Sequence, residues 1–197
     1  MPFARFLLAA LMSAGLAGPA AAKMSFQRET TDSGTRYIVI AGAFEPDDTA
    51  AGLKKEVEAF KPELVLFNSP GGNVASAMEY GRMIRQLGLS TLQVKDHECA
   101  SACSLAFLGG VERYAEPGSI GVHRASFTDE VESKEAVAAI QELTAEVIGY
   151  LTEMEVDPTL LQISLTVDNA DIRYLTAAEM LDLGVTTGDW SELGEVN

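Results

Sequence analysis

The chain has 197 residues, of which 29 are acidic and 14 are basic, giving a formal net charge of −15 at pH 7. Such acidity excludes nucleic acid and anionic membranes as expected partners, because both would repel the chain. The length is enough for one domain with its own core.

The first residues, MPFARFLLAALMSAGLAGPAAAK, have the layout of a cleaved secretory signal. A basic start at Arg5 is followed by an apolar run and by the small residues Ala20 and Ala22 before Lys23. A membrane anchor is the alternative, but the run is shorter than the roughly 20 residues that cross a bilayer. We therefore predict a signal peptide over residues 1–22, a single α/β domain over residues 23–197, and a periplasmic or secreted location.

Beyond the signal, strand patterns alternate with helix patterns. Strands are predicted over 25–31, 35–44, 63–69, 89–94, 113–115 and 120–123. Helices are predicted over 49–60, 74–87, 101–108, 133–154, 159–167 and between Thr176 and Gly184. Asp47 or Asp48 is the expected cap of the first helix, and Gly88 is expected to end the second. The alternation predicts an α/β fold with a mainly parallel sheet and right-handed crossovers.

In such folds, ligands and catalytic groups gather where strands lead into helices. Three loops occupy these places: NSPGGN (68–73), KDHECAS (95–101) and SIGVHR (119–124). In the first loop, Gly71 and Gly72 allow a sharp turn that aims N–H groups outward, where they can hold an oxyanion. A plain tight turn is the alternative. The spacing is neither that of a P-loop nor that of a dinucleotide-binding fingerprint.

The second loop ends in Ser101, a candidate nucleophile at a helix start. Its own N–H and that of Ala102 are expected to be unpaired by the helix, so that hydroxyl and donors converge. A helix cap or a small packing residue is the alternative role. His123, at the end of a later strand, is the candidate general base, and His97 in the same loop as Ser101 is the alternative.

Two carboxylates are candidates for orienting the histidine. Asp168 and Asp171 lie in the polar break VDNADIRY (167–174) between helical stretches. Either can equally be a surface residue of a turn. The residue types therefore suggest a Ser–His–Asp set and leave its acid open.

Cys99 and Cys103 are the only cysteines, and they flank Ser101. An oxidising compartment allows a disulfide between them. Helical positions four apart would place their Cα atoms about 6 Å apart, so the pairing is feasible but strained. One CxxxC pair offers too few ligands for zinc and lacks the CxxC redox spacing, so neither a metal nor another cofactor is expected.

Four segments in order form a larger pattern: LVLFNSPGGNVASAMEYGRMI, CASACSLAFLGG, PGSIGVHR and VDNADIRYLTAAEMLDLGV. They span about Leu64 to Val185 and resemble the ClpP-like serine protease family of the ClpP/crotonase fold, above all its exported bacterial members. The resemblance implies a ClpP/crotonase-like fold with repeated β-β-α units and flanking helices. It also implies that Ser101 is the nucleophile, that His123 is the base, and that Gly72 and Ala102 form the oxyanion hole.

The resemblance bears on the acid and on the partners as well. The family's acid lies six residues before the aromatic of an RFLSA-like segment, which is RYLTA in this sequence and points to Asp168, with Asp171 as the alternative. A peptide or protein substrate and a homo-oligomer are implied. No ATP-driven unfoldase is expected outside the cytoplasm. The chain departs from the family at RASFTDEVESKE (124–135), which is acidic and lacks the glycine-bearing, substrate-aligning strand.

The predicted function is therefore an exported serine hydrolase, a ClpP-like peptidase that works through an acyl-enzyme. A non-catalytic ClpP-like binding or scaffold protein is the alternative. Acyl-CoA chemistry of the crotonase kind is disfavoured, because the chain is expected to be exported and carries a serine where that branch has none.

Overall fold

The computed structural model describes residues 24–126 and 133–193. The predicted signal peptide, residues 1–22, and the acidic segment 127–132 lie outside the described residues. No helix within the described ranges is both long and apolar enough to cross a membrane.

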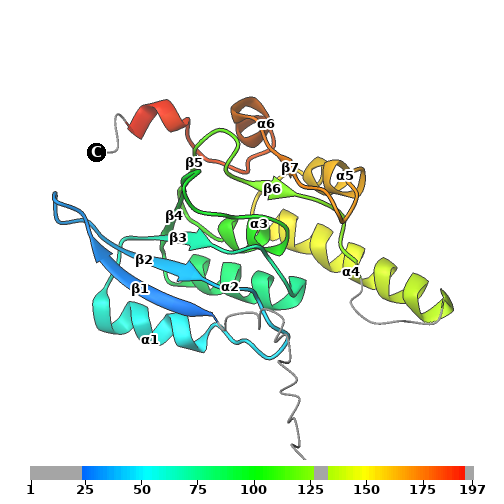
Figure 1. The fold of residues 1–197 in the computed structure, drawn as a ribbon, viewed down its shortest axis with the longest axis horizontal. Helices are drawn as coiled ribbons and strands as arrows, with labels where there is room; N and C mark the ends of the chain where they lie inside the picture. Colours follow the sequence, from blue (N-terminus) through cyan, green and yellow to red (C-terminus); the bar gives the residue numbers. More distant parts are fainter. Residues whose placement is uncertain (1–23, 127–132, 194–197) are drawn as a thin grey trace, which may run out of the picture.

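The centre of the fold is a five-stranded sheet in the order β1-β2-β3-β4-β5 (Figure 1). Its strands are β1 (Ser25–Thr30), β2 (Arg36–Ala41), β3 (Leu64–Asn68), β4 (Ser90–Gln93) and β5 (Arg113–Ala115). Only β1 is antiparallel to its neighbour. Across β2 and β3, Ile38 lies opposite Val65 and Ile40 opposite Phe67, all four fully buried. The predicted α/β fold with a mainly parallel sheet is thereby confirmed.

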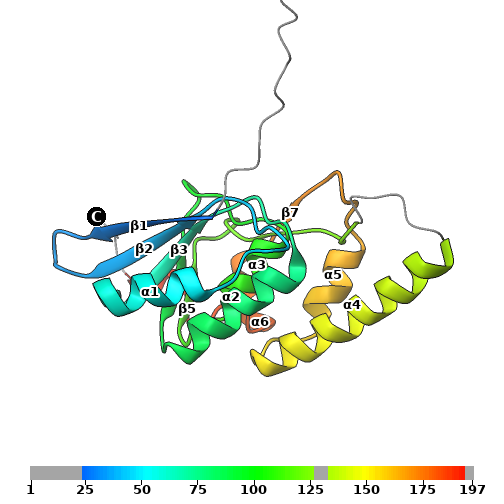
Figure 2. The same cartoon turned by 90° about the horizontal axis from the view of Figure 1, so that it is seen from below.

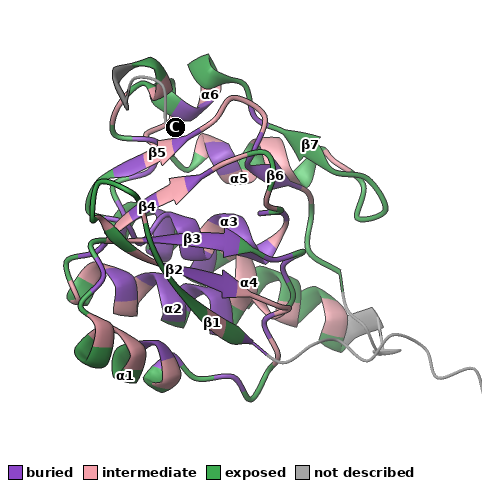
Figure 3. Cartoon of the chain, turned by 60° about the vertical axis from the view of Figure 1, so that its left-hand side comes forward, coloured by how far each residue is buried: buried purple, intermediate pink, exposed green. Residues whose placement is uncertain are grey.

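Helices flank this sheet and extend beyond it. They are α1 (Ala51–Phe60), α2 (Val74–Gln86), α3 (Ala102–Phe107), α4 (Ser133–Glu153), α5 (Thr159–Leu165), α6 (Ala177–Asp182) and a 3-10 turn over Trp190–Leu193. Figure 2 shows α1, α2 and α3 on the same face of the sheet, while the amino end of α4 projects away from it. The burial map agrees, because β3 and α3 are largely buried and β1 is exposed (Figure 3).

Helix α4 packs against both α2 and α3. The Tyr150 hydroxyl of α4 donates to the Leu105 carbonyl of α3 at 2.7 Å. A Cβ on Gly81 of α2 would lie 1.8 Å from that hydroxyl oxygen, so only glycine fits there. Burial, the main cause, raises the pKa of Tyr150 well above its ordinary value.

One local expectation is wrong. The N-cap of α1 is Ala50, which makes no side-chain cap bond, because the Asp48 carboxylate instead accepts the Glu45 N–H at 2.9 Å. The strand predicted at 120–123 is present as β6 (Gly121–Val122), which pairs antiparallel with β7 (Arg173–Tyr174) in a separate two-stranded sheet. The last helix, α6, has Thr176 as its N-cap, as predicted, and Thr176 forms a capping box with Glu179.

Single bridges tie the three predicted loops together above the sheet. They pair Phe44 with Gly72, Ser69 with Cys99, and Ala100 with Gly121. The loops that follow β3 and β4 and the strand β6 therefore meet along one edge. This edge contains the candidate site.

Candidate active site

Ser101 occupies a strained turn between an extended segment and a helix. Its φ of 59° and ψ of −129° are unusual for a residue other than glycine, and α3 begins at the next residue. Such backbone strain costs about 1–3 kcal/mol and persists only where the surrounding structure fixes it. The Ser101 side chain makes no capping hydrogen bond, so the serine does not act as a side-chain cap of α3. A strained strand-to-helix turn of this kind presents a nucleophilic hydroxyl in α/β-hydrolases.

Gly71 packs directly against that turn. A Cβ on Gly71 would lie 2.6 Å from the Ser101 Cβ, 2.7 Å from the Ala100 carbonyl oxygen and 2.9 Å from the Ala102 nitrogen. Gly71 also has a φ of 103°. Only glycine therefore lets the loop after β3 approach the serine this closely.

Two backbone N–H groups at this junction have no acceptor among the described residues. Gly72 lies opposite Phe44, but the two hydrogen bonds of this bridge are made by the residues on either side of Gly72. The Phe44 N–H donates to the Gly71 carbonyl, and the Phe44 carbonyl accepts from the Asn73 N–H. The Gly72 N–H therefore points away from Phe44. The Ala102 N–H likewise has no described acceptor. These are the two donors predicted for an oxyanion hole.

The N–H of Ser101 differs from the prediction. It is unpaired by the helix, as predicted, but it donates to the Gly121 carbonyl at 2.9 Å and so is not the free donor that was expected. The bond has a structural reason, because the segment before Ser101 runs beside β6 and forms the bridge between Ala100 and Gly121. It places the end of β6, and thus His123, next to the serine turn.

His123 lines the same cavity as Ser101. Its Nδ1 lies 3.1 Å from the Asn169 carbonyl oxygen. A carbonyl oxygen only accepts hydrogen bonds, so the neutral ring carries its proton on Nδ1 and leaves Nε2 as an acceptor. Within the described ranges, no hydrogen bond joins the Ser101 hydroxyl to the ring.

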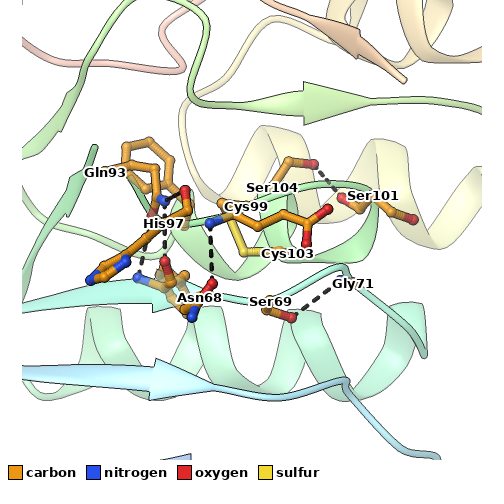
Figure 4. Close-up of a disulfide and its surroundings, with 12 residues drawn as sticks. Asn68, Ser69, Gly71, Gln93, His97, Cys99, Ser101, Cys103 and Ser104 are labelled. Atoms are coloured by element: carbon orange, nitrogen blue, oxygen red, sulfur yellow. Dashed lines mark hydrogen bonds between the residues drawn. A yellow bond between two sulfur atoms is a disulfide. The ribbon is translucent and has the colours of Figure 1, made fainter. Parts of the chain in front are cut away.

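His97, the alternative base, lies elsewhere. Figure 4 shows it on the opposite side of the disulfide from Ser101. Its Nδ1 is 3.0 Å from the Asp96 carbonyl, and its own carbonyl accepts from the buried Gln93 amide at 2.8 Å. Gln93 also bonds both backbone groups of Phe67 in β3. His97 thus belongs to the anchoring of the loop after β4, and it lines neither cavity at the serine.

The two candidate acids lie in a turn beside His123, but neither carboxylate bonds the ring. The Asp168 carboxylate pairs with the Arg124 guanidinium and accepts the Ala170 N–H at 3.1 Å. The Asp171 N–H donates to the Asp168 carbonyl at 3.0 Å. A catalytic role for Asp168 or Asp171 stays a prediction.

A disulfide joins Cys99 and Cys103 across the serine turn, with Cα atoms 5.2 Å apart (Figure 4). Both cysteines are fully buried. Cys99 lies in the extended segment before α3 rather than on the helix, so the helical estimate of about 6 Å does not apply. The bridge links the extended segment on one side of Ser101 to the helix on the other.

An apolar cavity of about 210 Å³ opens beside Ser101 and His123. Its walls are mainly aliphatic side chains of α4 and α5, namely Leu143, Val147, Leu151, Leu160 and Leu161. A second hollow of about 610 Å³ adjoins it along Gly72 and Asn73. Sequence analysis missed these walls, although the spacing of Leu143, Val147 and Leu151 by four on a helix signals one apolar face.

Metal chemistry has no obvious ligands in the described part of the chain. Nowhere in it do three His, Cys, Asp or Glu side chains gather as a metal ion would require. The chemistry available at the site is that of a hydroxyl, an imidazole and backbone donors.

Comparison with known proteins bears on the fold. No protein-family model matches the chain. No curated protein sequence matches it significantly. Among solved structures, it is similar to a mutant of the 1510-N membrane-bound stomatin-specific protease, with a TM-score of 0.50 over 76% of this chain and 75% of that one. The sequences are 19% identical, so the similarity concerns the fold alone: a protease-like α/β fold compatible with that of ClpP-like proteins.

Proposed function

We propose that this protein is an exported serine hydrolase of the ClpP/crotonase fold that cleaves peptides through an acyl-enzyme. The observation that carries the proposal is that a strained serine and a histidine line two adjoining cavities, with one N–H donor without a described acceptor at each, Ala102 at the first and Gly72 at the second. A site of this composition has the parts that acyl transfer requires.

In the proposed reaction, the Ser101 Oγ attacks the carbonyl carbon of the substrate. His123 Nε2 takes the hydroxyl proton as the C–O bond forms, and the carbonyl oxygen becomes an oxyanion held by the N–H groups of Gly72 and Ala102. The tetrahedral intermediate collapses when His123 gives that proton to the leaving amine and the C–N bond breaks. Water, activated by His123, then hydrolyses the ester. Loss of one oxyanion donor typically costs about 2.7–4 kcal/mol in such a reaction.

Peptides are the proposed substrates for two reasons. The similar solved structure is that of a protease. The cavity beside the serine is walled by aliphatic side chains and suits an apolar side chain on the acyl side of the cut. Export, self-association and independence from an ATP-driven unfoldase are further parts of this proposal.

A non-catalytic scaffold is the second candidate, and one observation favours it. No hydrogen bond joins Ser101 to His123 within the described ranges, and no carboxylate bonds the histidine. Catalytic hydrogen bonds often form only when substrate is bound, so the hydrolase remains the better-supported function.

Labelling of the full-length exported protein with a fluorophosphonate probe separates the two functions. The wild type should label, whereas Ser101→Ala and His123→Gln should not. His97→Gln is the matched control, because it removes the other histidine and should label like the wild type. A wild type that stays unlabelled beside a reactive control hydrolase would contradict the catalytic proposal. Equal loss in His97→Gln and His123→Gln would contradict the assignment of the base.

A further inference from the structure

The orientation of His123 depends on a main-chain group. Its Nδ1 lies 3.1 Å from the Asn169 carbonyl oxygen. This contact holds the proton on Nδ1 and leaves Nε2 to accept a proton, which is the arrangement that a general base for a serine needs. In hydrolases with a catalytic triad, a carboxylate has this role.

A tight turn over residues 168–171 presents the Asn169 carbonyl. The Asp171 N–H donates to the Asp168 carbonyl at 3.0 Å, and the Ala170 N–H donates to the Asp168 carboxylate at 3.1 Å. The second bond is that of an Asx turn, in which an aspartate side chain closes the backbone two residues on. Neither bond uses the Asn169 carbonyl, which is left for the histidine ring.

Arg124 ties this turn to the segment after β6 that carries the histidine. Its backbone N–H donates to the Val167 carbonyl at 3.2 Å, and its guanidinium pairs with the Asp168 carboxylate. On the other side of His123, β6 pairs with β7, with Val122 opposite Arg173. The ring and the turn are therefore held together from both sides.

We infer that the main-chain carbonyl of Asn169 orients His123, and that Asp168 is a positioning residue that acts through the turn. The inference rests on the proposed role of His123 as general base. The carboxylate of Asp168 is already occupied by Arg124 and by the Ala170 N–H. Arg124 and Asp168 have side chains 47% and 49% exposed, and such an exposed ion pair contributes little.

The size of the effect of Asp168→Asn distinguishes the two roles. The new amide oxygen can still accept the Ala170 N–H, so the turn and its Asn169 carbonyl are kept. We expect the rate of fluorophosphonate labelling to fall by less than about tenfold, since only an exposed ion pair is lost. Loss of a triad carboxylate lowers kcat by about 10⁴-fold. A fall on the order of 10³-fold or more in Asp168→Asn, or in the matched variant Asp171→Asn, would therefore overturn the inference.

Nitrogen NMR of the imidazole gives a readout that does not depend on activity. The chain has 2 histidines, so a His97→Gln background leaves the signals of His123 alone. For the neutral imidazole, we expect the tautomer protonated on Nδ1 with and without Asp168→Asn. A change to the tautomer protonated on Nε2 on introducing Asp168→Asn would overturn the inference. If the wild type fails to label but keeps the Nδ1 tautomer in both proteins, the proposed function fails and the orientation by Asn169 stands.

Discussion

Replacing Gly71 with alanine is expected to disable the site while the fold survives. The new Cβ would lie 2.6 Å from the Ser101 Cβ and 2.9 Å from the Ala102 nitrogen. Carbon atoms prefer separations of about 3.5–4.0 Å, so the serine turn has to move by about 1 Å. A misplacement of about 1 Å lowers rates by about 10²-fold. We therefore expect Gly71→Ala to react with fluorophosphonate at least about 100-fold more slowly than the wild type.

Gly34→Ala is the matched control for the backbone strain. The φ angles are similar, 103° at Gly71 and 94° at Gly34, but no atom lies within 4 Å of a Cβ on Gly34. Either substitution should lower the free energy of unfolding in urea by about 1–3 kcal/mol through backbone strain. Only Gly71→Ala should also lose labelling. A folded Gly71→Ala protein that labels at the wild-type rate would refute the role of this packing.

Two further predictions concern the buried parts of the fold. Replacing Cys99 and Cys103 together with alanine should lower the free energy of unfolding in urea by about 2 kcal/mol, because a short closed loop is opened in the unfolded chain. Two reactive thiols titrated in the exported wild type would contradict the bridge. Burial, with smaller contributions from Asp48 and Glu79, raises the pKa of Tyr80 from 10.0 to about 12. The stability this provides is complete below pH 10 and is lost as pH rises towards 12, because the unfolded chain gives up its proton first. Between about pH 9 and 11 the wild type should lose about 1 kcal/mol more than Tyr80→Phe, and equal losses in urea would contradict this account.

The main sheet and its helices were predictable because their signals are local. The apolar run 63–69 forms β3, and Gly88, with a φ of 67°, lies just beyond the end of α2 as expected. The separate sheet of β6 and β7 was not predictable in this way. Each of these strands has only two residues, and their pairing depends on how distant segments meet.

The strain at Ser101 also lies beyond a local signal. Its φ of 59° accompanies a bond from its N–H to the Gly121 carbonyl and the close approach of Gly71. Both partners come from other loops, so the residues next to Ser101 in the sequence do not indicate its backbone conformation. Sequence analysis could identify the serine through the three loops as a set, but not its geometry.

The backbone groups of the candidate site differ in how far residue types indicate them. The resemblance to the ClpP-like family implied the two N–H donors, Gly72 and Ala102. The residue types alone marked only a glycine turn and a helix start as places where backbone groups are left unpaired. The Asn169 carbonyl has no such mark, because every residue has a carbonyl and asparagine is ordinary in a turn. The residue types therefore point to the neighbouring carboxylate of Asp168 as the third catalytic group. The structure instead brings a main-chain oxygen to the ring, and leaves that carboxylate to shape the turn and to pair with Arg124.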